Sequence, residues 1–343
     1  PSSIPSAFLG CLYSLQPPFA DLPSDSTMGN APLVCLSNGH KMPLIGLGTW
    51  QSDKEEEHVK VLEEAVNMGY RLFDTAASYG NEEIIGRVMH NFYAKGTMAR
   101  CEFFITTKIW PTYLHPDRQM AAFKESLAKL DTPYVDLLLA HQPTCYELDG
   151  VTHDPSVTVE MIWQGLEKIY ETGLVKAIGV SNWSVEQMER VMKIAKVKIH
   201  VAQVECHVYL PQFELVEYCK KNKIVVTGYG SLGSPARKVP FLGRTLNFAD
   251  APNMFEEPAV IAVAQRYGKT PQQVLIRYLL DRGICVIPKS TNLDRLKTNL
   301  HGVVDFHLDE SDIEKLNNVP HRQRLFMQEH MAGHPEDSFA SER

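Results

Sequence analysis

The sequence lacks any Cys-x-x-Cys pair, any apolar run of membrane-spanning length and any excess of positive charge. Its 7 cysteines are an odd number and widely spaced, which is typical of reduced thiols and not of a disulfide framework or a zinc site. A membrane helix needs about 20 consecutive apolar residues, whereas even residues 135–140 are interrupted by Asp136. A net charge of -7, with Lys and Arg scattered, argues against a nucleic-acid or anionic-membrane surface. We therefore expect a cytoplasmic protein whose partner is a small molecule.

The first residues differ in composition from the rest of the chain. Residues 1–20 carry no charge and contain Pro5, Pro17 and Pro18. A signal peptide is one interpretation, but a basic n-region and a clear small-residue cleavage pattern are both missing. We expect residues 1–27 to form a disordered extension ahead of an alternative start at Met28, and residues 28–343 to form a single domain.

Short apolar runs alternate with longer amphipathic segments from Leu44 to about Leu300, without a linker between them. The pattern predicts eight strands, at residues 44–47, 71–73, 103–107, 135–140, 175–180, 201–204, 224–227 and 285–287. It predicts intervening helices that include residues 55–68, 116–130, 159–171, 185–195, 213–222 and 270–282. Eight such repeats favour an α/β fold, a (β/α)8 TIM barrel. An open doubly wound sheet would call for G-x-G-x-x-G after the first strand, but only Gly46-Leu-Gly48 is present.

Two further segments are expected to close the ends of this barrel. Residues 33–35 and 41–43 flank Ser-Asn-Gly-His, which predicts an N-terminal β-hairpin plugging the bottom. Residues 235–257 are irregular and rich in Pro and Gly, so we expect them to form a loop over the active face. The tail after Phe326 is expected to act there too, as a C-terminal loop.

Polar side chains follow three neighbouring strands of the predicted barrel. Asp74 follows the second strand, Lys108 ends the third and His141 the fourth, while Tyr79 lies in the loop after Asp74. Because the loops after parallel barrel strands meet at one face, these side chains are expected to converge. Each alone has a structural interpretation, such as a buried ion pair or a packed ring. Together they predict a catalytic group.

This combination suits the reduction of a carbonyl group, which needs a hydride donor and a proton donor at the oxygen. A Tyr hydroxyl, with a pKa of roughly 10, is a weak acid at neutral pH. We expect Lys108 to lower the pKa of Tyr79, Asp74 to hold Lys108 charged, and neutral His141 to orient the substrate oxygen. No metal is expected, because H-x-H and H-E-x-x-H spacings are missing near these residues and Lys108 would repel a cation.

Neutral polar groups stand at the ends of three further strands, namely Ser181, Asn182, Gln203 and Tyr229. Ser, Asn and Gln side chains can pair with the carboxamide of a nicotinamide, and a Tyr ring can stack on it. Lys289 and Arg295 flank the start of the last helix of the barrel, where such folds commonly hold phosphate. Two cations there suit a 2′-phosphate. Taken alone, a Lys and an Arg near a helix start are more often solvated surface charges; together with the amide-binding groups they predict NADPH as the cofactor.

Six motifs in this order resemble those of the aldo-keto reductases, specifically the monomeric NADPH-dependent reductases. They are Gly46-Leu-Gly-Thr-Trp50, Leu72-Phe-Asp-Thr-Ala-Ala-Ser-Tyr-Gly-Asn-Glu82, Gly179-Val-Ser-Asn182, Gln203-Val-Glu-Cys-His207, Leu232-Gly-Ser-Pro235 and Ile287-Pro-Lys-Ser290. The resemblance implies a catalytic tetrad of Asp74, Tyr79, Lys108 and His141, with Tyr79 as general acid, in an enzyme like an NADP-dependent alcohol dehydrogenase. It implies cofactor contacts at Thr49, Trp50, Ser181, Asn182, Gln203, Tyr229, Ser231, Leu232, Ser234, Lys289, Ser290, Thr291, Arg295 and Asn299.

The expected substrate pocket includes Trp50, Trp110, His141 and Gln142. The family commonly has an aromatic residue where Gln142 stands, so this pocket is expected to be more polar. Thr298 stands where many members carry Glu beside the adenine, which removes one expected contact. An alternative function on the same fold is an NADPH-binding protein with weak catalysis. The intact tetrad argues for the reductase.

Overall fold

The barrel of the computed structural model is built from strands that pair in the order in which they occur in the chain. The structure describes residues 27–28, 31–52, 54–235 and 251–342. The parallel strands are β4 (Gly46–Gly48), β5 (Leu72–Asp74), β6 (Phe104–Ile109), β7 (Val135–Ala140), β8 (Val175–Ser181), β9 (Val201–Glu205), β10 (Val225–Tyr229) and β11 (Ile284–Val286). Neighbours in this series are hydrogen-bonded from β4 to β11. The prediction of a parallel eight-stranded sheet is confirmed.

The two outer strands of the series meet and nearly close the barrel. Ile45 forms a parallel bridge to Val286, and the Val286 amide donates to the Leu44 carbonyl at 2.9 Å. The TIM-barrel prediction is therefore confirmed. Four of the eight barrel strands, β5, β6, β9 and β11, are buried along their whole length, and the other four are partly exposed at one or two residues each, as expected where helices cover the outside and side chains fill the inside.

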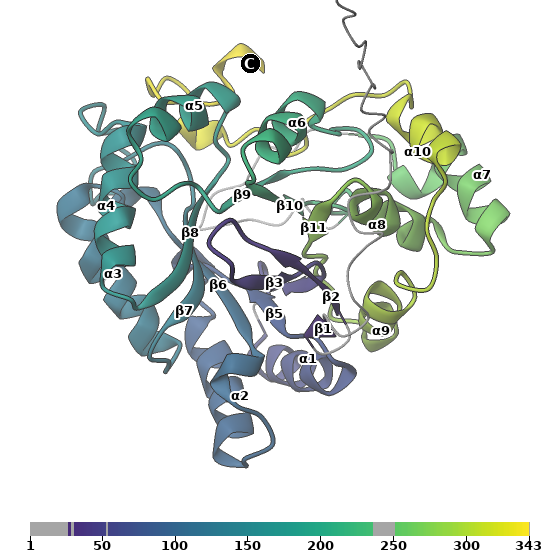
Figure 1. The fold of residues 1–343 in the computed structure, drawn as a ribbon, viewed down its shortest axis with the longest axis horizontal. Helices are drawn as coiled ribbons and strands as arrows, with labels where there is room; N and C mark the ends of the chain where they lie inside the picture. The colour runs from purple at the N-terminus through teal and green to yellow at the C-terminus, as the bar shows by residue number, and fades with distance from the viewer. Residues whose placement is uncertain (1–26, 29–30, 53, 236–250, 343) are drawn as a thin grey trace, which may run out of the picture.

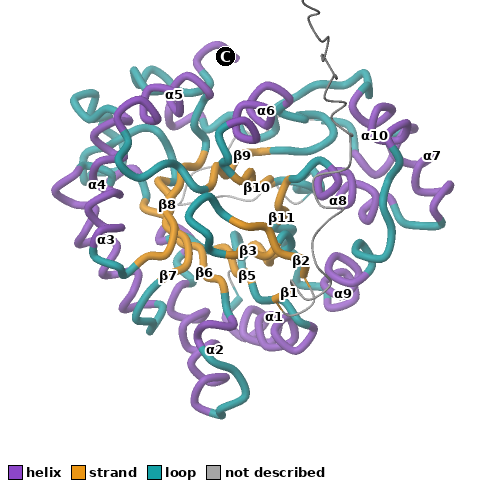
Figure 2. The backbone as a smooth tube through the Cα atoms, in the orientation of Figure 1, coloured by secondary structure: helices purple, strands orange, loops and turns teal. Residues whose placement is uncertain are grey.

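Helices surround the ring of strands (Figures 1 and 2). They are α1 (Glu55–Met68), α2 (Glu82–Ala94), α3 (Pro116–Lys129), α4 (Val159–Glu171), α5 (Val185–Ile194), α6 (Phe213–Lys221), α7 (Pro258–Tyr267), α8 (Pro271–Asp281), α9 (Leu293–His301) and α10 (Glu310–Asn317). The bounds of α1 and α4 match the sequence prediction. Apolar side chains at helical spacing, such as Val61, Leu62 and Ala65 of α1, are buried against the sheet.

A short antiparallel sheet lies across the centre of the ring in Figure 1. It contains β1 (Thr27–Met28), β2 (Ala31–Cys35) and β3 (Lys41–Pro43), with β2 pairing both neighbours. The predicted N-terminal hairpin is confirmed as β2 and β3. Residues 1–26 lie outside the described ranges, so the expected extension over residues 1–27 stays a prediction. Thr27, its last residue, pairs with Pro32 of β2.

Three other expectations also remain predictions: the loop over the active face, the cytoplasmic location and the monomeric state. Residues 236–250 of the expected loop over the active face lie outside the described ranges. Within the described residues, no helix is both long enough and apolar enough to cross a membrane. The cytoplasmic location and the monomeric state stay predictions.

Replacing Gly86 by Ala is expected to destabilise the fold. A Cβ on this α2 glycine would lie 2.5 Å from the Leu130 carbonyl carbon and 2.7 Å from the Lys129 oxygen, both backbone atoms at the C-terminal end of α3. We expect Gly86→Ala to cost about 1–3 kcal/mol of unfolding free energy, because overpacking outweighs the better helix propensity of Ala. The fall in Tm on thermal unfolding measures this loss of stability. Glu83→Ala, at an exposed position on the same helix, is the control. An unchanged Tm would show that α3 can shift freely.

Candidate active site

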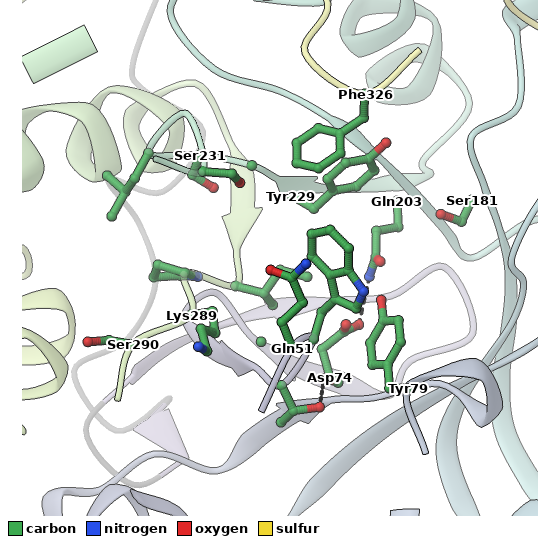
Figure 3. A pocket seen from close by; sticks show the side chains of 18 of the residues that line it. Gln51, Asp74, Tyr79, Ser181, Gln203, Tyr229, Ser231, Lys289, Ser290 and Phe326 are labelled. Atoms are coloured by element: carbon green, nitrogen blue, oxygen red, sulfur yellow. Dashed lines mark hydrogen bonds between the residues drawn. The ribbon is translucent and has the colours of Figure 1, made fainter. Parts of the chain in front are cut away.

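A cavity of about 1260 Å³ opens at the carboxyl ends of the barrel strands. It is lined by 19 of the 20 site residues expected from the sequence: Thr49, Trp50, Asp74, Tyr79, Trp110, His141, Gln142, Ser181, Asn182, Gln203, Tyr229, Ser231, Leu232, Ser234, Lys289, Ser290, Thr291, Arg295 and Asn299. Lys108 is fully buried beneath it. Figure 3 places Tyr79 and Asp74 at one end of the cavity and Lys289 with Ser290 at the other.

The Lys108 ammonium organises the first end of the cavity. Its nitrogen donates to Asp74 Oδ1 at 2.6 Å, to the Thr75 carbonyl at 2.8 Å and to the Tyr79 hydroxyl at 3.2 Å. An ammonium has three hydrogens, so these three acceptors use all of them. The Tyr79 oxygen therefore accepts from Lys108, and its own hydrogen is left to point elsewhere. Because Tyr79 lines the cavity, that hydrogen is available to a molecule bound there.

The net shift in the Tyr79 pKa is opposite to the one expected from Lys108. Burial, and secondly the negative charge of Asp74, raise the pKa of Tyr79 well above its usual 10. The expected lowering of this pKa was therefore wrong. Desolvation of the phenolate outweighs the ammonium, whose charge is offset by the Asp74 carboxylate in contact with it. Tyr79 keeps its proton throughout the neutral range.

His141 faces Tyr79 from the next part of the cavity wall. The two rings are 5.7 Å apart at a steep angle, and the Trp110 ring lies 5.1 Å from His141 on another side. Burial, and secondly the charge of Lys108, lower the pKa of His141 well below 6.5, so the ring is neutral. Its Nδ1 is buried without a partner among the described residues. The tautomer with its proton on Nε2 would present a donor to a molecule in the cavity, which His141 lines.

Hydrogen bonds hold both the side-chain carboxylate and the backbone carbonyl of Asp74. Gln203 donates to the second carboxylate oxygen at 2.8 Å, and Thr49 donates from its hydroxyl to the Asp74 carbonyl at 2.9 Å. The loop that carries Tyr79 is tied to the same point, because Asn81 donates to the Thr49 carbonyl at 2.8 Å. Contacts at the neighbouring ends of β4 and β5 thus hold Asp74 and the loop that carries Tyr79, two of the three partners of Lys108.

The middle of the cavity carries the amide and hydroxyl groups expected to meet a nicotinamide. The backbone of Asn182 is left-handed, with a φ angle of 62°, a conformation that Asn tolerates better than most residues. Its amide donates to the His141 carbonyl at 3.0 Å, and its oxygen accepts from the Tyr229 hydroxyl at 2.7 Å. Since Gln203 gives an N–H to Asp74, its oxygen remains as an acceptor for a carboxamide.

The far end of the cavity is positively charged. Lys289 and Arg295 are exposed side chains beside the start of α9, and no ion pair is formed by either within the described ranges. Asn292 caps α9 by accepting from the Arg295 amide at 2.9 Å. A helix N-terminus with two cations and the Ser290 and Thr291 hydroxyls is a donor set that fits a phosphate. Thr298 donates its hydroxyl to the Asp294 carbonyl at 2.7 Å, within its own helix.

Sequence reasoning placed the tail after Phe326 at the active face, but it did not name five individual cavity residues as site residues. Gln51, Tyr146, Phe326, Gln328 and His330 all line the cavity. Gln51 follows Thr49 and Trp50 directly, so its place next to a known motif was a usable signal. The others come from a loop after β7 and from the chain's last segment, where no periodic pattern indicates which residues turn inward.

Comparisons with protein-family models, curated proteins and solved structures all point to the same family. The family model described as "Aldo/keto reductase family" matches residues 44–320. Aldo-keto reductase family 1 member A1 of Homo sapiens is 37% identical over 297 residues, covering 84% of this chain and 89% of the relative. Member A1-A of Danio rerio is 37% identical over 304 residues, covering 86% and 91%.

Two solved structures are similar over nearly the whole chain. The aldose reductase from Schistosoma japonicum has a TM-score of 0.81 and 33% identity, covering 91% of this chain and 99% of that one. An aldo-keto reductase complexed with NADPH has a TM-score of 0.82 and 33% identity, covering 91% and 94%.

Proposed function

The chain belongs to the aldo/keto reductase family, and from this premise we propose that it reduces aldehydes or ketones to alcohols with NADPH, using Tyr79 as general acid. Bound NADPH would supply the hydride. Its nicotinamide amide would be held by Ser181, Asn182 and Gln203, next to Tyr229. Its 2′-phosphate would be held by Lys289 and Arg295 with the α9 N-terminus.

The hydrogen-bond arrangement around Tyr79 is the observation that carries this proposal. Lys108 donates to the Tyr79 oxygen and to Asp74, so the Tyr79 hydrogen is directed to a carbonyl oxygen in the cavity. When charge develops on that oxygen, Tyr79 gives up its proton and the ammonium 3.2 Å away stabilises the phenolate formed. Neutral His141 donates a second hydrogen bond that orients the same oxygen.

The substrate would lie between Trp50, Trp110, His141 and Gln142. Gln142 replaces an aromatic residue common in the family, and its amide donates to Gln328 at 3.3 Å. The polar Gln142–Gln328 pair thus stands where an aromatic ring would have added apolar surface beside the two Trp rings. We therefore propose a substrate less dependent on aromatic stacking than those of relatives with an aromatic residue there.

Purified protein mixed with NADPH and a panel of aldehydes and ketones is expected to consume the cofactor only when a carbonyl is present. The near-ultraviolet absorbance of NADPH follows the reaction, and chromatography identifies the alcohol formed. NADPH binding without any carbonyl-dependent loss of absorbance would favour the alternative, a cofactor-binding protein with weak catalysis.

A further inference from the structure

Glu205 is a buried carboxylate that the proposed chemistry does not use. It ends β9, and it is 0% exposed. Oε1 accepts from the Leu325 amide at 2.6 Å and lies 2.7 Å from His207 Nε2, while Oε2 accepts from the Phe326 amide at 3.0 Å. Burying a carboxylate is costly unless donors satisfy it. Here both oxygens are satisfied, and two of the donors belong to the chain's last segment.

The segment held in this way forms one wall of the cavity. Residues 326–330 all line it. The Phe326 ring lies 5.9 Å from Trp50 and 5.5 Å from Tyr229, and Figure 3 shows Phe326 directly over Tyr229. Gln328 donates to the Tyr229 hydroxyl at 3.4 Å. We call residues 326–330 the C-terminal wall.

The far end of the C-terminal wall is fixed separately. The Tyr146 hydroxyl donates to the His330 carbonyl at 3.0 Å, and His153 Nε2 lies 2.9 Å from the same oxygen. Among the described residues, the backbone at the two ends of the wall is therefore anchored by Glu205 at one end and by Tyr146 with His153 at the other. Of the two anchors, only Glu205 is on a barrel strand that also carries a cofactor-site residue, since Gln203 precedes it by two positions on β9.

We infer that Glu205 is a positioning residue, which holds the C-terminal wall against Trp50 and Tyr229 and so sets the affinity for the carbonyl substrate. This inference rests on the proposed function. Glu205 lies on the same strand face as Gln203, because alternate residues of a strand point the same way. Its register partner on β10 is Tyr229. One carboxylate thus fixes the wall relative to two cofactor-site residues.

A Gln at this position cannot reproduce the anchor. Its amide carries one acceptor oxygen and one NH2 group, which only donates. Whichever way the amide turns, the NH2 faces the backbone N–H of Leu325 or of Phe326, and two donors repel. At least one hydrogen bond to the wall is lost, while the side chain keeps its shape.

Glu167 offers a matched control. It is 5% exposed on α4, and its Oε1 accepts from the Lys196 and Val197 amides at 2.7 and 2.8 Å. It does not line the cavity. Glu167→Gln therefore breaks the same kind of carboxylate anchor for a loop elsewhere in the molecule.

The test compares steady-state kinetics of Glu205→Gln and Glu167→Gln with those of the unaltered protein. Glu205→Gln is expected to raise KM for the carbonyl about tenfold or more with kcat changed less than threefold, while Glu167→Gln leaves KM unchanged. Amide hydrogen exchange should be at least tenfold faster at Leu325 and Phe326 in Glu205→Gln only. If this variant does not fold, Glu205→Asp, which keeps the charge but is shorter, is expected to show the same changes to a smaller extent.

Equal KM changes in the two Gln variants, or faster exchange at 325–326 with an unchanged KM, would overturn the inference. A chain that reduces no carbonyl would contradict the proposed function alone. In that case unchanged exchange at residues 325–330 in Glu205→Gln would overturn the positioning role, and faster exchange there, with no such change in Glu167→Gln, would support it.

Discussion

Tyr79→Phe is expected to lower kcat by about 100-fold or more, the usual scale for the loss of a general acid, while NADPH binding stays within a few-fold. The substitution removes one oxygen and leaves the ring, which packs 5.7 Å from His141. Lys108 keeps two of its three acceptors, Asp74 and Thr75. The cavity thus retains its shape and its charge but loses the proton that it gives to the substrate oxygen.

Single-turnover rates of NADPH oxidation give the measurement, and a titration of NADPH fluorescence gives the affinity. Tyr278→Phe is the control, because it removes a hydroxyl that donates to Asn317 Oδ1 at 2.7 Å in a fully buried position away from the cavity. The rate should also stay flat through neutral pH, since the raised pKa of Tyr79 keeps its proton bound there. A Tyr79→Phe variant that retains most of its rate would rule out Tyr79 as the acid.

Arg295→Ala is expected to weaken NADPH binding by about tenfold or more and to leave NADH binding nearly unchanged. Each charge-assisted hydrogen bond contributes about 1.5–3 kcal/mol, and only NADPH carries the 2′-phosphate to which Arg295 and Lys289 would donate. With both cations present, we expect the unaltered protein to prefer NADPH over NADH by roughly a hundredfold or more, as the sum of two such bonds implies.

Fluorescence titration of both cofactors tests the assignment of the phosphate site. Lys297→Ala is the control, since Lys297 is an exposed cation on the same helix but does not line the cavity. A loss of NADPH affinity in Arg295→Ala but not in Lys297→Ala would show that Arg295 contacts the phosphate directly, because both variants remove one positive charge from the same helix. Equal weakening of NADPH and NADH would mean that Arg295 supports the helix or the shared part of the cofactor.

The barrel and the residues at its strand ends were predictable because they depend on local patterns. Apolar runs of strand length at regular intervals specify a parallel barrel, and every strand overlaps its predicted range. Strand ends then place Asp74, His141 and Gln203 at one face by topology alone. Residues such as Leu232, Thr291 and Asn299 were expected only from the resemblance to the aldo-keto reductases, and with them 19 of the 20 expected site residues line the same cavity.

Features that depend on contacts distant in sequence were not predictable. The C-terminal wall is irregular in sequence, and it is held by Glu205, about 120 positions earlier. The direction of the Tyr79 pKa shift depends on a balance between burial and two opposite charges, which a sequence does not supply. The neutrality of His141 was expected, and burial is its main cause.

The bridge between Ile45 and Val286 has a consequence for the chain while it is being synthesised. Until residue 286 has left the ribosome, the edge of β4 has no partner on its outer side and carries unpaired backbone groups, which is the kind of edge that promotes association between chains. Nearly the whole barrel sequence must therefore be made before that edge is covered. Nascent chains that stall before β11 should be the ones that most need chaperones.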